Sequence, residues 1–320
     1  MKLTTKIKLG ALGIIGGVAI TATLKKTIDR LVNTHLSSKG IQHIKADVMS
    51  QKNKDDFANS PEVILGTLFH NTTPQTNITI PNREGRYINA LVYNQNEESS
   101  KYVILVHGYR SQPKSLSYLA KHYFEAGYNV LLPYMRAHYG SDYEYSTMGW
   151  FERFDIMDWI DYIDSKVESA HVILHGVSMG AATVMMTTGE HLPSCVKCAI
   201  EDCGYTSVYD AYSYKIPKMM HIPAFPAVDL FGSAIKKKIG FDIRVASALD
   251  QVKKSQIPTL FIHGESDSVV PVSMVYKLYE NAACEKDILI VKNAEHAMSP
   301  LVSPELYWNR VWNFINEKTK

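Results

Sequence analysis

The fold is decided by the stretch Val172-Ile173-Leu174-His175-Gly176-Val177-Ser178-Met179-Gly180-Ala181-Ala182. An apolar run typical of a buried strand leads into small residues typical of a closely packed helix, and Gly-x-Ser-x-Gly lies between them. A serine in such a strained strand-to-helix turn needs neighbours with almost no side chain two residues before it and two after it. The helix N-terminus then offers free N–H groups and a dipole that favour negative charge. The pattern therefore predicts that Ser178 is a nucleophile.

Short apolar runs alternate with helical patterns on both sides of this turn, from about residue 76 onward. Buried strands that alternate with helices predict an α/β fold with a mostly parallel sheet and helices on both faces. Such sheets place their active sites at the carboxyl ends of the strands. The predicted strands are Asn77–Ile80, Tyr87–Tyr93, Tyr102–Val106, Asn129–Pro133, His171–Leu174, Val196–Glu201, Thr259–His263 and Ile288–Val291, with a hairpin turn between the first two.

Four stretches carry a family pattern: Leu105-Val106-His107-Gly108-Tyr109, Arg136-Ala137-His138-Tyr139-Gly140-Ser141, Gly176 to Gly180, and His263-Gly264-Glu265-Ser266-Asp267 followed by Val270-Pro271. With them, roughly residues 76–320 resemble the α/β-hydrolase superfamily, in particular bacterial esterases and serine aminopeptidase-like hydrolases. The chain order Ser, Asp, His also fits. The family often has His-Gly-x-Ser after the arginine, whereas Tyr139 here separates His138 from Gly140. We therefore expect a different shape for that loop.

The resemblance implies a base and an acid for Ser178. A neutral imidazole must accept the serine proton, and a carboxylate must hold its other nitrogen in the right tautomer. His296 lies in the loop between the last strand and the last helix, where the family carries its base. Asp267 follows the next-to-last strand and is the expected acid. Glu265 on the same loop and Asp202 after the preceding strand are the alternatives.

Two backbone N–H groups are expected to bind the oxyanion of an acyl-transfer reaction. One is that of Met179, directly after the nucleophile. The other is that of Tyr109, in the turn after His107 and Gly108, which the resemblance identifies as the oxyanion loop.

The regular pattern of strands and helices fails between Glu201 and Asp250. Tyrosine, phenylalanine and methionine crowd this segment, and three prolines interrupt it. The α/β-hydrolase superfamily inserts caps at this position, so we expect a cap at about residues 205–250. Its inner face would form a pocket for apolar groups. The alternative is a set of extra helices packed on the core.

The N-terminus departs from the composition of a soluble domain. The apolar run Leu9 to Leu24 has 16 residues and is bounded by lysines on both sides. As a helix it would span about 24 Å, slightly less than a bilayer core. Residues 1–26 are therefore expected to be an uncleaved membrane anchor, with a cleaved signal segment or a soluble helix as alternatives. Residues 27–75 are predicted to be a stalk, and residues 76–320 the catalytic domain.

An anchor before such a domain resembles the membrane-tethered hydrolases of Gram-positive bacteria. Basic residues are nearly balanced across the apolar run, and the N-terminal amine favours an N-terminus inside the cell. The catalytic domain would then lie outside the cytoplasmic membrane.

Composition excludes some classes of function. The net charge of +2 gives no reason to propose a nucleic-acid partner. Cys195 and Cys198 form a lone Cys-x-x-C at the start of an apolar strand, without the second ligand pair of a zinc site. We interpret them as core residues, and we expect neither a metal nor a cofactor.

These observations together predict a carboxylesterase that cleaves short to medium acyl esters through an acyl-serine intermediate. A serine peptidase or amidase is the alternative among enzymes. A binding protein without activity on the same fold is a more distant alternative, and a missing triad member would support it. No member is missing from the sequence.

Overall fold

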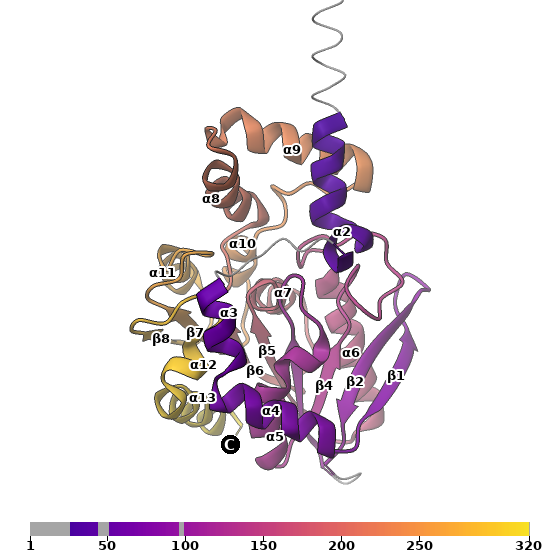
Figure 1. Cartoon of the computed structure of the whole chain (residues 1–320). Helices are drawn as coiled ribbons and strands as arrows, with labels where there is room; N and C mark the ends of the chain where they lie inside the picture. Colours follow the sequence, from indigo (N-terminus) through magenta and orange to yellow (C-terminus); the bar gives the residue numbers. More distant parts are fainter. Residues whose placement is uncertain (1–25, 44–50, 96–98, 320) are drawn as a thin grey trace, which may run out of the picture.

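The computed structural model describes residues 26–43, 51–95 and 99–319. Its centre is an eight-stranded sheet in the order β1-β2-β4-β3-β5-β6-β7-β8 (Figure 1). β2 is antiparallel to β1 and β4, and all other neighbours are parallel. The predicted mostly parallel sheet is confirmed, and each predicted strand lies within three residues of its expected ends. The strands are β1 (Thr76–Pro81), β2 (Tyr87–Tyr93), β3 (Lys101–Val106), β4 (Asn129–Pro133), β5 (His171–Val177), β6 (Val196–Asp202), β7 (Thr259–Gly264) and β8 (Lys286–Val291).

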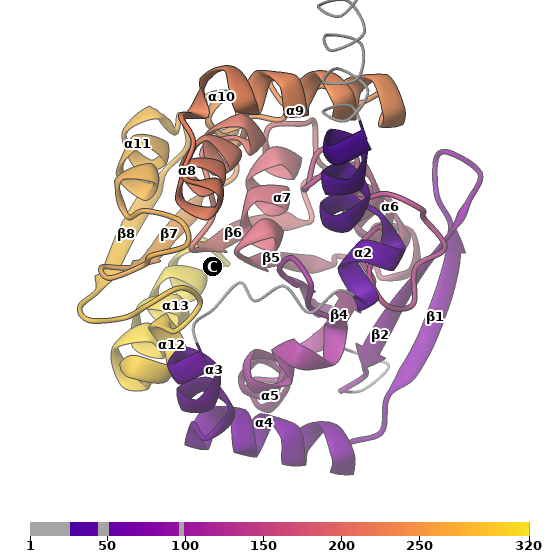
Figure 2. The ribbon, with the colours of Figure 1, turned by 45° about the horizontal axis from the view of Figure 1, so that its top comes forward.

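Helices cover both faces of the sheet, as predicted (Figure 2). Along β3 the side chains alternate between the two faces. Ile104 and Val106 join one apolar core with α6 (Glu152–Lys166), α7 (Met179–Thr188) and α11 (Ser273–Asn281). Val103 and Leu105 join the other core with α4 (Pro61–Thr72), α5 (Ser117–Glu125) and α13 (Pro304–Lys318). The shorter helices are α2 (Ser38–His43), α3 (Gln51–Ala58), η1 (Pro113–Leu116), α10 (Ala248–Val252) and α12 (Ser299–Val302).

The inserted segment between β6 and β7 forms the helices α8 (Val208–Met220) and α9 (Ala224–Ile239). The pair lies away from the sheet, beside the helical residues 26–36 (Figure 1). Phe231 of α9 is buried and packs edge-to-face on Tyr212 of α8, with ring centroids 5.1 Å apart. The aromatic side chains that marked this segment in the sequence thus hold the two cap helices together.

The described part of residues 27–75 is packed on the fold, whereas the sequence predicted a stalk. Val32 and Leu36 are fully buried in the first core. Phe69 of α4 is buried in the second core, against Tyr93. Gly66 brings α4 so close to α5 that a Cβ atom there would overlap the backbone of Tyr118. Isolated apolar residues in a polar sequence therefore find partners that only the tertiary fold supplies.

The predicted anchor falls almost wholly on residues 1–25, outside the described residues. Within residues 26–43, 51–95 and 99–319, no helix is both long enough and apolar enough to cross a bilayer. Cys195 and Cys198 are buried among apolar residues, as the sequence indicated.

Close backbone packing at the start of α7 sets the position of the helix on the sheet, and it generates a prediction for stability. A Cβ atom on Gly180 would overlap the carbonyl group of Val106 in β3. Gly180→Ala should therefore lower the free energy of unfolding, measured in urea, by at least about 3 kcal/mol, because neither backbone can yield without moving a strand.

Gly240→Ala is the matched control. Gly240 has φ 75° but nothing within 4 Å of the added carbon, so only the backbone cost of about 1 kcal/mol applies. Equal losses in the two variants would contradict the close approach at Gly180.

Candidate active site

Ser178 occupies the turn between β5 and α7 in a strained conformation with positive φ, at φ 58° and ψ −117°. Residues other than glycine rarely adopt such a conformation, and they keep it only where the surroundings enforce it. The surroundings here are close-packed: a Cβ atom on Gly176 would overlap the carbonyl of Gly180. The N–H of Ser178 donates to the carbonyl oxygen of Asp202, over 2.8 Å. These contacts therefore hold Ser178 in a fixed conformation at the carboxyl end of β5.

The structure brings Ser178, His296 and Asp267 together in one hydrogen-bonded row. The Ser178 hydroxyl lies 2.8 Å from Nε2 of His296, and Nδ1 of His296 lies 2.7 Å from Oδ2 of Asp267. Because an ionised carboxylate only accepts, Nδ1 carries the proton and Nε2 is free to accept the serine proton. His296 and Asp267 are both buried. The arrangement is that of a nucleophile, a base and an orienting acid.

Asp267 is held ionised by its surroundings. Burial opposes its charge, but His296 and His263 outweigh burial and keep the pKa of the Asp267 carboxyl well below its usual range. Its Oδ1 accepts from the backbone N–H groups of Val269 and Val270, both over 2.8 Å. Nε2 of His263 lies 3.3 Å from Oδ2 and 2.9 Å from the carbonyl oxygen of Val270. His263 thus supports the ionised carboxylate; the fourth sequence motif contained this residue but did not show the contact.

The two alternative acids do not contact His296 through a hydrogen bond. Glu265 is exposed. Asp202 is buried, and its Oδ2 accepts from the Tyr307 hydroxyl over 3.0 Å. Burial raises the pKa of Asp202 to about 6, and it raises the pKa of the neighbouring Glu201 to about 8. Asp202 and Glu201 are thus buried carboxyls outside the hydrogen-bonded row, and Asp267 alone of the three candidate acids contacts the base.

The predicted oxyanion donors lie on either side of the serine. Met179 is the first residue of α7, where backbone N–H groups have no partner within the helix. A Cβ atom on Gly108 would lie 3.3 Å from Cβ of Ser178, so the chain that leads into Tyr109 passes beside the nucleophile. The role of these two N–H groups stays a prediction.

Two buried histidines brace the loop that carries Tyr109. The N–H of Arg110 donates to Nε2 of His138 over 2.9 Å, and the N–H of Met135 donates to Nε2 of His107 over 3.3 Å. Burial lowers the pKa of His107 to about 3 and that of His138 to about 4, so both rings stay neutral and able to accept. The loop of His138 therefore holds the oxyanion loop in place. Its sequence motif was visible, but its contact with Arg110 was not.

A cavity of about 390 Å³ lies in front of Ser178. The described residues that line it come from α3, the oxyanion loop, η1, the start of α5, and the loops that carry Tyr139, Ser178 and His296, and not from the cap helices α8 and α9. The prediction that the inner face of the cap forms this pocket is therefore wrong for the described residues. The lining residues are Lys54, Phe57, Gly108, Tyr109, Arg110, Ser111, Gln112, Ser115, Leu116, Tyr118, Tyr139, Val177, Ser178, His296 and Ala297.

One group among the described residues has the spacing of metal ligands, namely Cys203, Asp267 and His296. Burial, with Asp202 and Asp267 nearby, raises the pKa of the Cys203 thiol well above its usual value. A metal would need the thiolate, and His296 and Asp267 already bond to each other. His296 and Asp267 therefore fit their places in the hydrogen-bonded row with Ser178 better than they fit a metal site.

Comparisons with known proteins agree with this geometry. Residues 114–320 match the model of the prolyl oligopeptidase family. The uncharacterised protein YqkD of Bacillus subtilis (strain 168) is 30% identical over 217 residues, which are 67% of this chain and 70% of that protein. A thermostable monoacylglycerol lipase of Bacillus sp. (strain H-257) is 26% identical over 215 residues, which are 61% of this chain and 82% of the lipase.

Solved structures share the fold. The Pyrococcus furiosus esterase Pf2001 superposes with a TM-score of 0.62 at 21% identity, over 78% of this chain and 93% of the esterase. The Pyrococcus horikoshii acylaminoacyl peptidase gives 0.58 at 16% identity, over 79% of this chain and 43% of the peptidase. The chain is therefore a serine hydrolase of the α/β-hydrolase superfamily, and it belongs to the prolyl oligopeptidase family.

Proposed function

We propose that the protein is a carboxylesterase that cleaves short to medium acyl esters, with Ser178 as nucleophile. The hydrogen-bonded row from Ser178 through His296 to Asp267 carries this proposal. In it, the Ser178 oxygen attacks the ester carbonyl carbon while Nε2 of His296 takes the hydroxyl proton. The new imidazolium keeps its Nδ1 proton toward Asp267, whose ionised carboxylate stabilises the charge.

The remaining steps return the site to its starting state. The N–H groups of Met179 and Tyr109 would bind the tetrahedral oxyanion, aided by the dipole of α7. His296 then gives its proton to the leaving alcohol, and the acyl group stays on Ser178. A water molecule loses a proton to His296 and attacks the acyl-serine, so the acid leaves and the serine regains its proton.

The lining of the cavity favours esters over peptides with a free N-terminus. An aminopeptidase binds the substrate ammonium group with carboxylates, and the described lining residues include no aspartate or glutamate. Phe57, Leu116, Tyr118 and Val177 offer apolar surface to an acyl chain instead. The 26% identical relative is named a monoacylglycerol lipase, which supports the same choice. The family name keeps the peptidase or amidase as the second candidate.

Parallel assays of p-nitrophenyl esters and aminoacyl anilides test the function. We expect turnover of acetate, butyrate and octanoate esters and at least 100-fold slower turnover of the anilides. Ser178→Ala should lower ester turnover by several orders of magnitude and abolish labelling by a fluorophosphonate. Comparable rates on esters and anilides would favour the peptidase, and undiminished labelling of Ser178→Ala would place the nucleophile elsewhere.

The acid is tested by Asp267→Asn. Without the carboxylate, His296 loses the tautomer that accepts the serine proton, and ester turnover should fall by about 10⁴-fold. Glu265→Gln is the matched control on the same loop, and because Glu265 is exposed we expect nearly full activity. The assignment fails if the two variants have similar rates.

We also propose that the apolar run Leu9 to Leu24 anchors the protein in the cell membrane, with the catalytic domain outside the cytoplasm. The lysines on both sides of the run support the anchor, and the N-terminal amine, which tips a nearly balanced count of basic residues, supports the orientation. The full chain should sediment with membranes. A chain that begins at Lys26 should remain in the supernatant with unchanged ester turnover. Protease added to intact cells should digest the catalytic domain. Digestion only after lysis would indicate that the catalytic domain faces the cytoplasm.

A further inference from the structure

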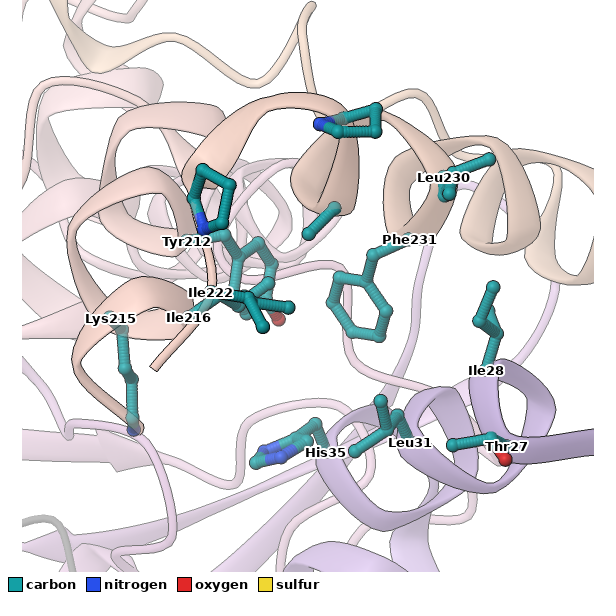
Figure 3. A pocket seen from close by; sticks show the side chains of 13 residues that line it. Thr27, Ile28, Leu31, His35, Tyr212, Lys215, Ile216, Ile222, Leu230 and Phe231 are labelled. Carbon is teal, nitrogen blue, oxygen red and sulfur yellow. The ribbon is translucent and has the colours of Figure 1, made fainter. Parts of the chain in front are cut away.

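A second cavity lies between the helical residues 26–36 and the cap helices α8 and α9 (Figure 3). Its volume of about 270 Å³ is close to that of the smaller ligand pockets of proteins. It shares no described lining residue with the cavity in front of Ser178. We call it the helix–cap pocket. It is lined by Thr27, Ile28, Leu31, His35, Tyr212, Lys215, Ile216, Ile222, Pro223, Pro226, Ala227, Leu230 and Phe231.

The helix–cap pocket has one polar end and one apolar end. Figure 3 shows the Lys215 amine and the His35 imidazole at one end, and Ile28 and Leu230 toward the other. Leu31 and Phe231 lie between them. The apolar stretch gives a chain of methylene groups contact on several sides, and water gains few partners there.

The polar end carries the Lys215 amine, which has no carboxylate beside it in the described part of the chain. Among the described residues no carboxylate pairs with Lys215, whose amine lies 5.8 Å from the centre of the Tyr109 ring. Burial and the nearby Arg110 lower the pKa of Lys215. Burial, Lys215 and Arg110 lower the pKa of His35 to about 4, so its ring is neutral and can donate one hydrogen bond. An anion at this end would relieve the cost of burying the amine.

Tyr109 separates the helix–cap pocket from the catalytic cavity. Its hydroxyl donates to the carbonyl oxygen of His35 over 2.8 Å, and its side chain also lines the cavity of Ser178. An acyl chain attached to Ser178 would have to displace this side chain to reach Lys215. The occupant that suits the pocket as it stands is a separate molecule.

We propose that the helix–cap pocket binds a fatty carboxylate, with its head group on Lys215 and His35 and its hydrocarbon chain along Leu31, Phe231 and Ile28. An uncharged hydrocarbon would leave the amine without a negative charge beside it. A peptide would bury its own polar backbone against apolar side chains, at a high cost in free energy. The proposal does not depend on the esterase activity, because the two sites share no described residue.

Binding of dodecanoate to the full-length protein tests the proposal. Isothermal titration below the micellar concentration should give one site per chain. Lys215→Met keeps the length of the side chain but removes its charge, and it should weaken dodecanoate at least 10-fold. Lys218→Met is the matched control, because Lys218 is exposed one turn farther along α8, and its affinity should equal that of the unaltered protein.

Two further comparisons distinguish a lost head-group contact from misfolding of the Lys215→Met variant. Dodecanol, which lacks the charge, should bind the unaltered protein about 10-fold more weakly than dodecanoate does. Its affinity for Lys215→Met should equal its affinity for the unaltered protein. Protein labelled at Ser178 by a small fluorophosphonate should still bind dodecanoate. Equal dodecanoate affinity of Lys215→Met and the unaltered protein would overturn the head-group assignment. Loss of binding after labelling would place the fatty acid in the catalytic cavity, whereas failure of the labelling itself would contradict only the proposed function.

Discussion

The contact between the backbones of β3, β5 and α7 is the constraint on which the active site depends. Gly180 packs directly against the carbonyl group of Val106, and Gly176 packs directly against the carbonyl group of Gly180. Both contacts exclude a side chain, and together they hold Ser178 at a positive φ that a serine rarely adopts. The same contacts place the free N–H groups of α7 beside the serine. The strained backbone of Ser178 thereby gives the nucleophile one fixed orientation.

Neutral histidines extend this fixed geometry outward from the serine. Burial keeps the rings of His107 and His138 uncharged, so each can accept a backbone N–H of a neighbouring loop. His263 behaves differently: Asp267 and Glu201 outweigh burial and raise its pKa. The charge that His263 can carry faces the carboxylate of Asp267. The charge of each ring thus matches its hydrogen-bond partner: His107 and His138 are neutral beside backbone amides, and His263 faces a carboxylate.

The sequence was informative where chemistry demands particular residues at particular strand ends. Ser178, Asp267 and His296 could be named because each follows a strand of strong apolar character, and parallel strands bring such ends together. The lining of the catalytic cavity could not be named. Phe57 of α3 lines the cavity although it lies far from Ser178 in the sequence. The residues around it are rich in lysine and aspartate, a composition typical of an exposed segment.

The N-terminal segment is the clearest case in which local composition misled. Val32 and Leu36 stand among polar residues, yet the cap and the core bury both of them. The segment also bonds to the oxyanion loop, because Tyr109 donates to the carbonyl of His35 and Arg110 donates to the carbonyl of Thr34 over 3.0 Å. A boundary at residue 76 therefore divides groups that are physically one unit. A movement of the helical residues 26–36 would therefore act on hydrogen bonds to the loop that passes beside Ser178. The part of the chain nearest the predicted anchor is in this way coupled to the active site without lining its cavity.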